Sequence, residues 1–269
     1  MTKLKEYLES EEYLEGFTFY GVLGNNIIIF KTKGKYVPDQ KSKPILSESF
    51  RKHQNEFGGC ALFGSLCRTA LGGLHLMADI NVTSVLIGMG KNIMKFDTHS
   101  ELGKRSLLVS NHKELLEDLM FNRTLPFNKV FRVIPVVKLD RENLKAVILL
   151  PGINAEKDVY NSKRLPFFRI MVAMGSVPDI IYNSTSEAYE PIVNDFHSAC
   201  EKFTTEWYSS TSNITPQTIT LQLPESRRQE ITDNVTFLLS IAIQFGRYDW
   251  LHEPVEKKHA GYGKILKVF

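Results

Sequence analysis

Apolar residues recur at three- and four-residue steps across residues 47–121, which is the spacing of one helix face. The clearest stretch reads FRKHQNEFGGCALFGSLCRTAL, residues 50–71, and it predicts a long helix. The apolar stripe of this helix consists of Phe50, Phe57, Cys60, Gly64, Cys67, Leu71 and Leu74. A second helix is predicted from about residues 79–96. A third is predicted to begin near Asn111, because Asn111 and Glu114 have the spacing of a capping box.

After Pro126 the spacing of apolar residues changes to two, as expected of strands that bury one face. Residues 131–139 and 144–150 alternate in this way on either side of a polar turn, which predicts a hairpin. The alternation is clearest in residues 235–245. Further strands are predicted at 167–173, 180–183, 203–209, 218–223 and 264–269. Many short alternating strands with no helical spacing between them favour an antiparallel sandwich.

The N-terminal part of the chain has its own pattern. Residues 3–15 predict a short amphipathic helix, and residues 17–41 predict a hairpin with turn residues at 24–26. The predicted fold class is therefore α+β, with an N-terminal β-hairpin and helical module followed by an antiparallel β-sandwich. We expect two domains, with the hairpin and helical module in residues 1–126 and the sandwich in residues 127–269.

Composition narrows the class of protein without naming a function. Hydrophobic residues make up 43% of the 269 positions and charged residues 23%, which is typical of a soluble globular protein. The net charge of +3 neither demands nor excludes a polyanionic partner. The chain shows no apolar run long enough for a membrane span and no secretory signal, so we expect a cytoplasmic protein.

Three cysteines, at positions 60, 67 and 200, argue against a disulfide framework or a structural zinc site, because the number is odd and no CxxC pair occurs. Cys60 follows two glycines in a way that resembles a turn exposing a nucleophilic thiol. It also lies on the apolar stripe with Cys67, and free cysteines are often fully buried. We favour packing over catalysis at this position.

The sequence gives only weak support for a phosphate-binding loop or a metal site. Gly58, Gly59 and Gly64 lack the spacing of a phosphate-binding loop and more readily explain the close approach of another backbone. Metal-type ligands occur in residues 96–105 (Asp97, His99, Glu101) and 195–201 (Asp195, His197, Cys200), each without a second cluster. No metal or other cofactor is predicted.

Basic residues outnumber acidic ones across residues 50–105. The candidate contacts to an anion or a nucleic acid are Arg51, Lys52, Lys104 and Arg105. The alternative is a solvated face with internal ion pairs that join Glu56 or Asp97 to Arg68 or Arg105. We favour this alternative, because no nucleic-acid-binding motif accompanies the charge.

Several short motifs carry a resemblance. They are Asn55-Glu56-Phe57-Gly58, residues 64–71 (GSLCRTAL), Asp97 with Gly103-Lys104-Arg105, and Phe121-Asn122. Together they resemble an uncharacterised Bacteroidota (flavobacterial-type) protein family whose helix reads roughly EFG…K.LR.AL and whose C-terminal half is β-rich. The chain departs from that pattern at residues 63–65, where the family usually has a lysine.

That family has no assigned activity, so the resemblance implies an architecture and no reaction. Glu56, Arg68, Asp97 and Arg105 are among the shared residues. We expect them to fix the helical half through ion pairs.

The leading functional hypothesis is a non-enzymatic structural or interaction protein. It would bind itself or another protein through the sandwich and through exposed strand edges, such as residues 20–36 and 264–269. The alternative is a nucleic-acid-binding protein that uses the basic helical face. A third hypothesis is an enzyme that depends on Cys60 or His99.

Overall fold

The computed structural model describes residues 17–21, 28–32, 47–193 and 199–269. The chain divides into two compact units, Met1–Ser47 and Glu48–Phe269, which are described separately. In the first unit, β1 (Phe17–Gly21) and β2 (Ile28–Thr32) pair antiparallel, which confirms the predicted hairpin. The predicted helix at 3–15 and turn at 24–26 lie outside the described residues.

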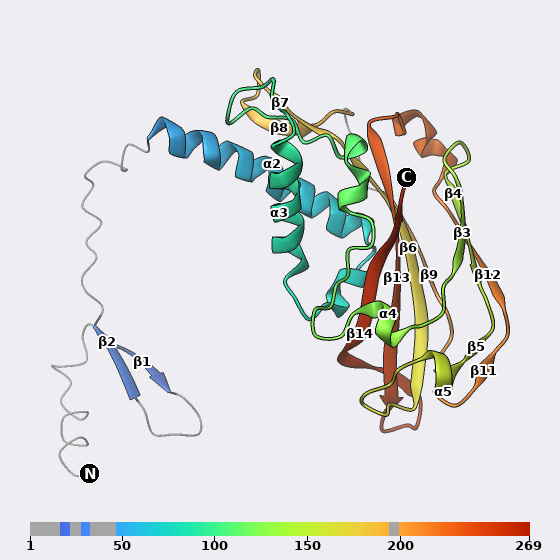
Figure 1. The fold of residues 1–269 in the computed structure, drawn as a ribbon. Coiled ribbons are helices and arrows are strands. Elements are labelled where there is room, and N and C mark those ends of the chain that lie inside the picture. The colour runs from blue at the N-terminus through green and yellow to red at the C-terminus, as the bar shows by residue number, and fades with distance from the viewer. Residues whose placement is uncertain (1–16, 22–27, 33–46, 194–198) are drawn as a thin grey trace, which may run out of the picture. The chain divides into compact units, whose positions relative to one another are not determined.

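A long antiparallel sheet is the centre of the second unit (Figure 1). Its strand order is β10–β6–β13–β14, and β9 also pairs with β6. The bounds are β6 Phe167–Pro178, β9 Cys200–Thr204, β10 Tyr208–Ser209, β13 Val235–Tyr248 and β14 Pro254–Val268. β6 pairs with β13 over its whole length, from Pro178 opposite Val235 to Phe167 opposite Gly246.

A smaller antiparallel sheet covers one face of the central sheet (Figure 1). It has the order β12–β4–β3, with β12 at Gln217–Gln222, β4 at Lys145–Leu150 and β3 at Val136–Asp140. Alternate residues of β4, namely Ala146, Ile148 and Leu150, are buried against the central sheet. The two sheets share one hydrophobic core, so the predicted antiparallel β-sandwich is confirmed.

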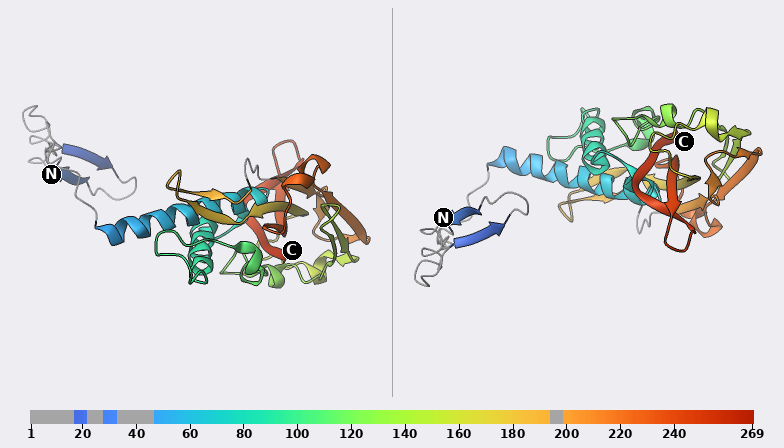
Figure 2. Two further views of the ribbon diagram at one scale, coloured as in Figure 1. Left: turned by 90° about the horizontal axis from the view of Figure 1, so that it is seen from above. Right: turned by 90° about the horizontal axis from the view of Figure 1, so that it is seen from below.

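Helices cover the opposite face of the central sheet, as Figures 1 and 2 show. α2 (Glu48–Ala70) and α3 (Val82–Met94) pack against each other, and α2 also packs on β6. They bury a second core with the sheet residues that point away from the sandwich, such as Ala173, Leu238 and Ile265. The α+β class is therefore confirmed, with helices, central sheet and small sheet in three layers.

The compact unit does not divide near residue 126. The change from helical to strand spacing there marks a change of layer, because α2 shares a core with β6 and β13. The boundary between compact units falls between Ser47 and Glu48.

The predicted third helix is wrong. Residues near Asn111 form only two short 3-10 turns, η3 (Val109–Asn111) and η4 (Lys113–Leu115). Asp118 has a φ of 61°, which ends any helix. The next residues run beside β14 instead: the N–H of Phe121 donates to Gly263 O at 2.9 Å.

The remaining elements are short. They are η2 (Leu74–Met77), α4 (Phe127–Val130), β5 (Ile153–Asn154), α5 (Ala155–Asp158), β7 (Ile180–Asn183), β8 (Ala188–Pro191), β11 (Asn213–Ile214) and η5 (Glu225–Glu230). β7 and β8 form a hairpin that lies against α2. Among the described residues, no helix combines the length and the apolar character that crossing a bilayer requires.

Candidate functional site

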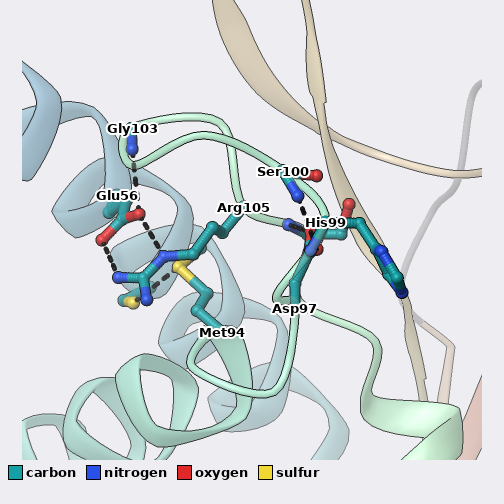
Figure 3. Close-up of polar contacts among 9 residues, drawn as sticks. Glu56, Met94, Asp97, His99, Ser100, Gly103 and Arg105 are labelled. Carbon is teal, nitrogen blue, oxygen red and sulfur yellow. Dashed lines mark hydrogen bonds and ion pairs between the residues drawn. The ribbon is translucent and has the colours of Figure 1, made fainter.

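Glu56 and Arg105 form a bidentate ion pair beneath α2 (Figure 3). Nε and Nη2 of Arg105 each donate to a different carboxylate oxygen of Glu56 at 2.7 Å, and the N–H of Gly103 donates to Oε1 at 3.0 Å. Only 3% of Glu56 is exposed. Burial raises the pKa of Glu56, but the hydrogen bonds from Arg105 and Gly103 outweigh it and hold the pKa below its usual value. The pair therefore joins α2 to the loop that follows α3.

The carboxylate of Asp97 accepts hydrogen bonds from the backbone of that same loop (Figure 3). Its Oδ1 accepts the N–H groups of His99 and Ser100 at 3.1 and 3.0 Å, and its Oδ2 accepts the N–H of Ser106 at 2.7 Å. Burial opposes the charged form, but these hydrogen bonds prevail and keep the pKa of Asp97 far below its usual range. Asp97 therefore stabilises the loop through these hydrogen bonds, and among the described residues it does not form an ion pair with Arg68.

The predicted basic contacts are mostly neutralised at short range. Lys52 Nζ lies 2.8 Å from Glu48, and Lys104 Nζ lies 3.9 Å from Glu101. Arg105 is engaged by Glu56, which leaves Arg51 as the exposed member of the set without a carboxylate in reach among the described residues. Gly103 packs against Lys52, so the loop that carries Lys104 and Arg105 lies beside α2, but three of the four cations already have a carboxylate partner.

Arg68 lies apart from the Glu56 pair. Its Nη1 donates to Thr83 Oγ1 of α3 at 3.4 Å, a long and weak hydrogen bond. Among the residues that the structure describes, it therefore links α2 to α3 through a hydrogen bond and not through an ion pair.

Two glycines of α2, Gly59 and Gly64, and its two cysteines, Cys60 and Cys67, pack against neighbouring elements. A Cβ on Gly59 would lie 2.7 Å from the Tyr189 ring, and one on Gly64 would lie 3.2 Å from Ile87. Burial, reinforced by the charge of Glu56, raises the pKa of the Cys60 thiol to about 11. A thiol with that pKa is protonated at neutral pH and is a poor nucleophile.

Neither metal hypothesis gains support. Within the part of the chain that the structure describes, no three His, Cys, Asp or Glu side chains gather in a way that could hold an ion. Asp195 and His197 lie outside the described residues.

A cavity of about 300 Å³ with several basic residues in its lining lies on the central sheet beside η2. Its walls come from η2, β6, β9, β13 and β14, and the lining includes Arg169, Lys202, Glu256, Lys257, Lys258 and His259. The run Glu-Lys-Lys-His at 256–259 was the one feature of the sequence that could have indicated this cavity. A charged run in a strand usually indicates a face exposed to solvent, so it did not predict a site.

A row of side chains crosses the sheet in this cavity. Nε of Arg169 donates to Gln244 Oε1 at 2.8 Å, and Gln244 Nε2 donates to Glu256 Oε2 at 3.1 Å. On its other side the guanidinium of Arg169 lies over the ring of Trp207, 4.4 Å from its centroid. These contacts fix Arg169 in one position.

The turn between β13 and β14 exposes apolar side chains. Trp250 is 84% exposed, and its neighbours Leu251 and Tyr248 are exposed as well. Oδ1 of Asp249 accepts the N–H groups of Leu251 and Glu253 at 2.8 and 2.9 Å. The turn is thus held rigid while it presents Trp250 to solvent.

No family model, no curated protein and no solved structure matches the chain. The resemblance to the Bacteroidota family stays a prediction.

Proposed function

We propose that this chain is a non-enzymatic interaction protein that binds another protein through the turn between β13 and β14. The observation that carries the proposal is the exposure of Trp250 on a turn whose backbone is already fixed. Tryptophan is enriched among the residues that dominate binding energy. A rigid turn loses little conformational freedom on binding, so it favours affinity.

Contacts at the base of the turn support this preorganisation. Besides the two bonds to the Asp249 side chain, the N–H of Asp249 donates to Glu253 O at 2.9 Å, and the N–H of His252 donates to Asp249 O at 3.3 Å. The Tyr248 ring packs edge-on against Phe167, with centroids 4.7 Å apart. Trp250 and Leu251 therefore extend from a braced base.

The partner is assigned by chemistry as a different protein with an apolar pocket. The cavities around Arg132, Arg141 and Arg169 all carry charged side chains in their linings, so an apolar pocket of another protein is the better match for an indole ring. The carboxylates of Asp249 and Glu253 beside the turn oppose binding to an anionic membrane surface.

The free strand edges support partner binding less directly. The terminal strand β14 is partly covered, because Ile265 N–H donates to Leu119 O and Phe121 N–H to Gly263 O. β3 pairs only with β4 among the described strands, so the backbone of Val136–Asp140 is a second place for strand addition. Ile134, which is 82% exposed, lies before this strand and supplies no backbone group to its edge.

The test compares three forms of the full chain as bait in extracts of the cells that produce it: wild type, Trp250→Ala/Leu251→Ala and Ile134→Ala. The last removes an equally exposed apolar side chain elsewhere. A photo-crosslinking residue at position 250 then identifies what lies against the turn. We expect a protein that crosslinks at 250, binds the Ile134 variant and loses the double variant.

Three results would contradict the proposal. They are equal loss of the partner in the Ile134 variant, retention by the Trp250 variant, and a crosslink to lipid alone. Sedimentation of the purified chain checks the assignment to a different protein, because a dimer that depends on Trp250 would overturn it.

A further inference from the structure

The central sheet carries an irregularity beside the basic cavity. Gln244 of β13 lies opposite Gly261 of β14, but Gly246 lies opposite Glu256. The single residue Phe245 thus faces four residues, Lys257 to Ala260, which bulge out of the sheet. His259 within this bulge has a φ of 56°, a backbone conformation that a side chain disfavours. Bulges and such conformations recur next to functional sites.

The bulge concentrates positive charge on the cavity. The charged lining consists of Arg169, Lys202, Lys257 and Lys258 against the carboxylate of Glu256. A fifth cation braces the bulge from outside, because Lys163 Nζ donates to the backbone oxygen of His259 at 3.1 Å. Four cations around a concave site focus a positive potential that one half-exposed carboxylate does not cancel.

Arg169 supplies a fixed donor at the floor of the cavity. Its Nε donates a hydrogen bond to Gln244 Oε1, and its Nη2 lies 3.5 Å from Glu256 Oε2. Its Nη1 has no hydrogen-bond partner among the described residues. Only 24% of the side chain is exposed, and the Trp207 ring covers one face of the guanidinium. A ligand therefore meets a donor that is already oriented and already partly desolvated.

The remaining lining defines the rest of the ligand. Met171, Met77 and Leu76 add apolar side chains to the lining of the cavity. The volume of about 300 Å³ is at the small end of the range for sites that hold small molecules. A ligand that fits this cavity therefore consists of a compact anionic group attached to a short apolar group.

We propose that this cavity binds a phosphate monoester with a small apolar substituent. Phosphate is favoured over carboxylate because the lysines act as point charges around a multivalent anion, and because Arg169 has one free nitrogen and no free fork. A nucleic acid strand fits less well. Its bases would need an aromatic ring on which to stack, and the Trp207 ring beside the cavity already has the Arg169 guanidinium over it.

The experiment measures binding of inorganic phosphate, phenyl phosphate and phenol to the full chain by calorimetry at constant ionic strength. The test variants are Arg169→Gln and Lys257→Gln/Lys258→Gln. The matched control is Lys129→Gln/Lys138→Gln, which removes the same charge from exposed positions elsewhere. We expect phenyl phosphate to bind more tightly than phosphate, phenol not to bind, and both test variants to weaken binding at least tenfold.

The control variant should bind as wild type does. Equal weakening in the control would overturn the proposal, since it would show attraction by net charge alone. Tighter binding of a single-stranded oligonucleotide at the same residues would overturn it as well. Vesicles with phosphatidic acid form a separate arm: binding there that depends on Lys257 and Lys258, together with phenyl phosphate binding, assigns the phosphate to a lipid headgroup. Binding of soluble phenyl phosphate without vesicle binding assigns it to a free small molecule.

Discussion

Ala70 at the end of α2 lies directly on Gly175 of β6. A Cβ placed on Gly175 would be 2.3 Å from the Cα of Ala70 and 2.4 Å from its carbonyl oxygen. The obstructing atoms are backbone, which cannot rotate away. The helical layer therefore approaches the sheet as closely as it does because position 175 has no side chain.

Gly175→Ala should destabilise the fold. The added methyl must push α2 away from β6 or distort both elements, and overpacking of this kind costs about 1–3 kcal/mol or more. We expect a lower midpoint of urea unfolding, measured by circular dichroism.

Gly58→Ala is the matched control in the same helix. No described atom lies within 4 Å of a Cβ at position 58. Removing a glycine from a helix interior should therefore stabilise the protein by about 0.5–1 kcal/mol. Equal destabilisation by both changes would show that close approach at Gly175 is not the cause.

Glu56→Gln should lower the free energy of unfolding by about 3 kcal/mol at neutral pH, because it leaves the Arg105 guanidinium without its counter-charge. The folded-state pKa of Glu56 lies below its ordinary value of 4.5. Its charge therefore stabilises the fold fully above that value, and the stabilisation is lost as the pH falls through the lowered folded-state pKa. The difference between wild type and variant should shrink on acidification below about pH 4.5.

Glu48→Gln controls for that measurement. Glu48 also pairs with a cation, Lys52, but on the exposed surface of α2. We expect little change in stability at any pH, since exposed pairs contribute little. A loss at Glu56 that stays constant down to strongly acidic pH would contradict the assigned role of its charge.

Arg68→Ala and Arg105→Ala should differ in effect. Arg105 compensates a buried carboxylate, so its removal should cost about 3 kcal/mol. Arg68 has one long hydrogen bond to Thr83, and its removal should cost under about 1 kcal/mol. Thermal unfolding of both variants under one condition measures the difference, and a larger loss for Arg68 would refute the assignment of the pair.

Native thiols should react slowly. Burial raises the pKa of Cys60 and of Cys200 to about 11, and Cys67 is fully buried. At pH 7.5 we expect Ellman's reagent to modify Cys60 and Cys67 only at the rate of unfolding, and to reach all three cysteines in denaturant. Rapid native modification of Cys60, located by mass spectrometry, would revive the nucleophile hypothesis.

Regular spacing made much of the fold predictable. The strand at 144–150 buries the alternate residues that its periodicity selects, so local pattern and tertiary burial agree there. In the helix at 50–71 the predicted stripe is buried from Cys60 onward, but Phe50 and Phe57 are 53% and 60% exposed. The strand at 235–245 is buried on both faces, because it lies between two layers. A third helix was wrongly predicted near Asn111, because Leu119 and Phe121 satisfy their backbone groups on β14, a contact between distant segments. A local stretch of sequence around residue 111 does not include β14, so it cannot show that pairing with β14 competes with helix formation.

The candidate sites were less predictable for the same reason. Arg105 reaches Glu56 from 49 positions away, and the sequence left open whether Arg68 or Arg105 would do so. The cavity around Arg169 depends on a bulge in the pairing of β13 with β14, and none of the bulged residues 257–260 is a glycine, a proline or another typical turn residue that would predict it. A sequence shows which residues are charged, but it does not show which of them meet in the folded chain.

Both hydrophobic cores depend on β13. One of its faces carries Phe237 and Ile241 into the sandwich, and the other carries Leu238 and Ala242 under the helices. During synthesis on the ribosome, α2 and β4 must therefore wait for residues after 234 before either has its full apolar partner. The growing chain exposes apolar surface on both layers until that strand emerges, so a ribosome that stalls before it would leave a nascent chain dependent on chaperones.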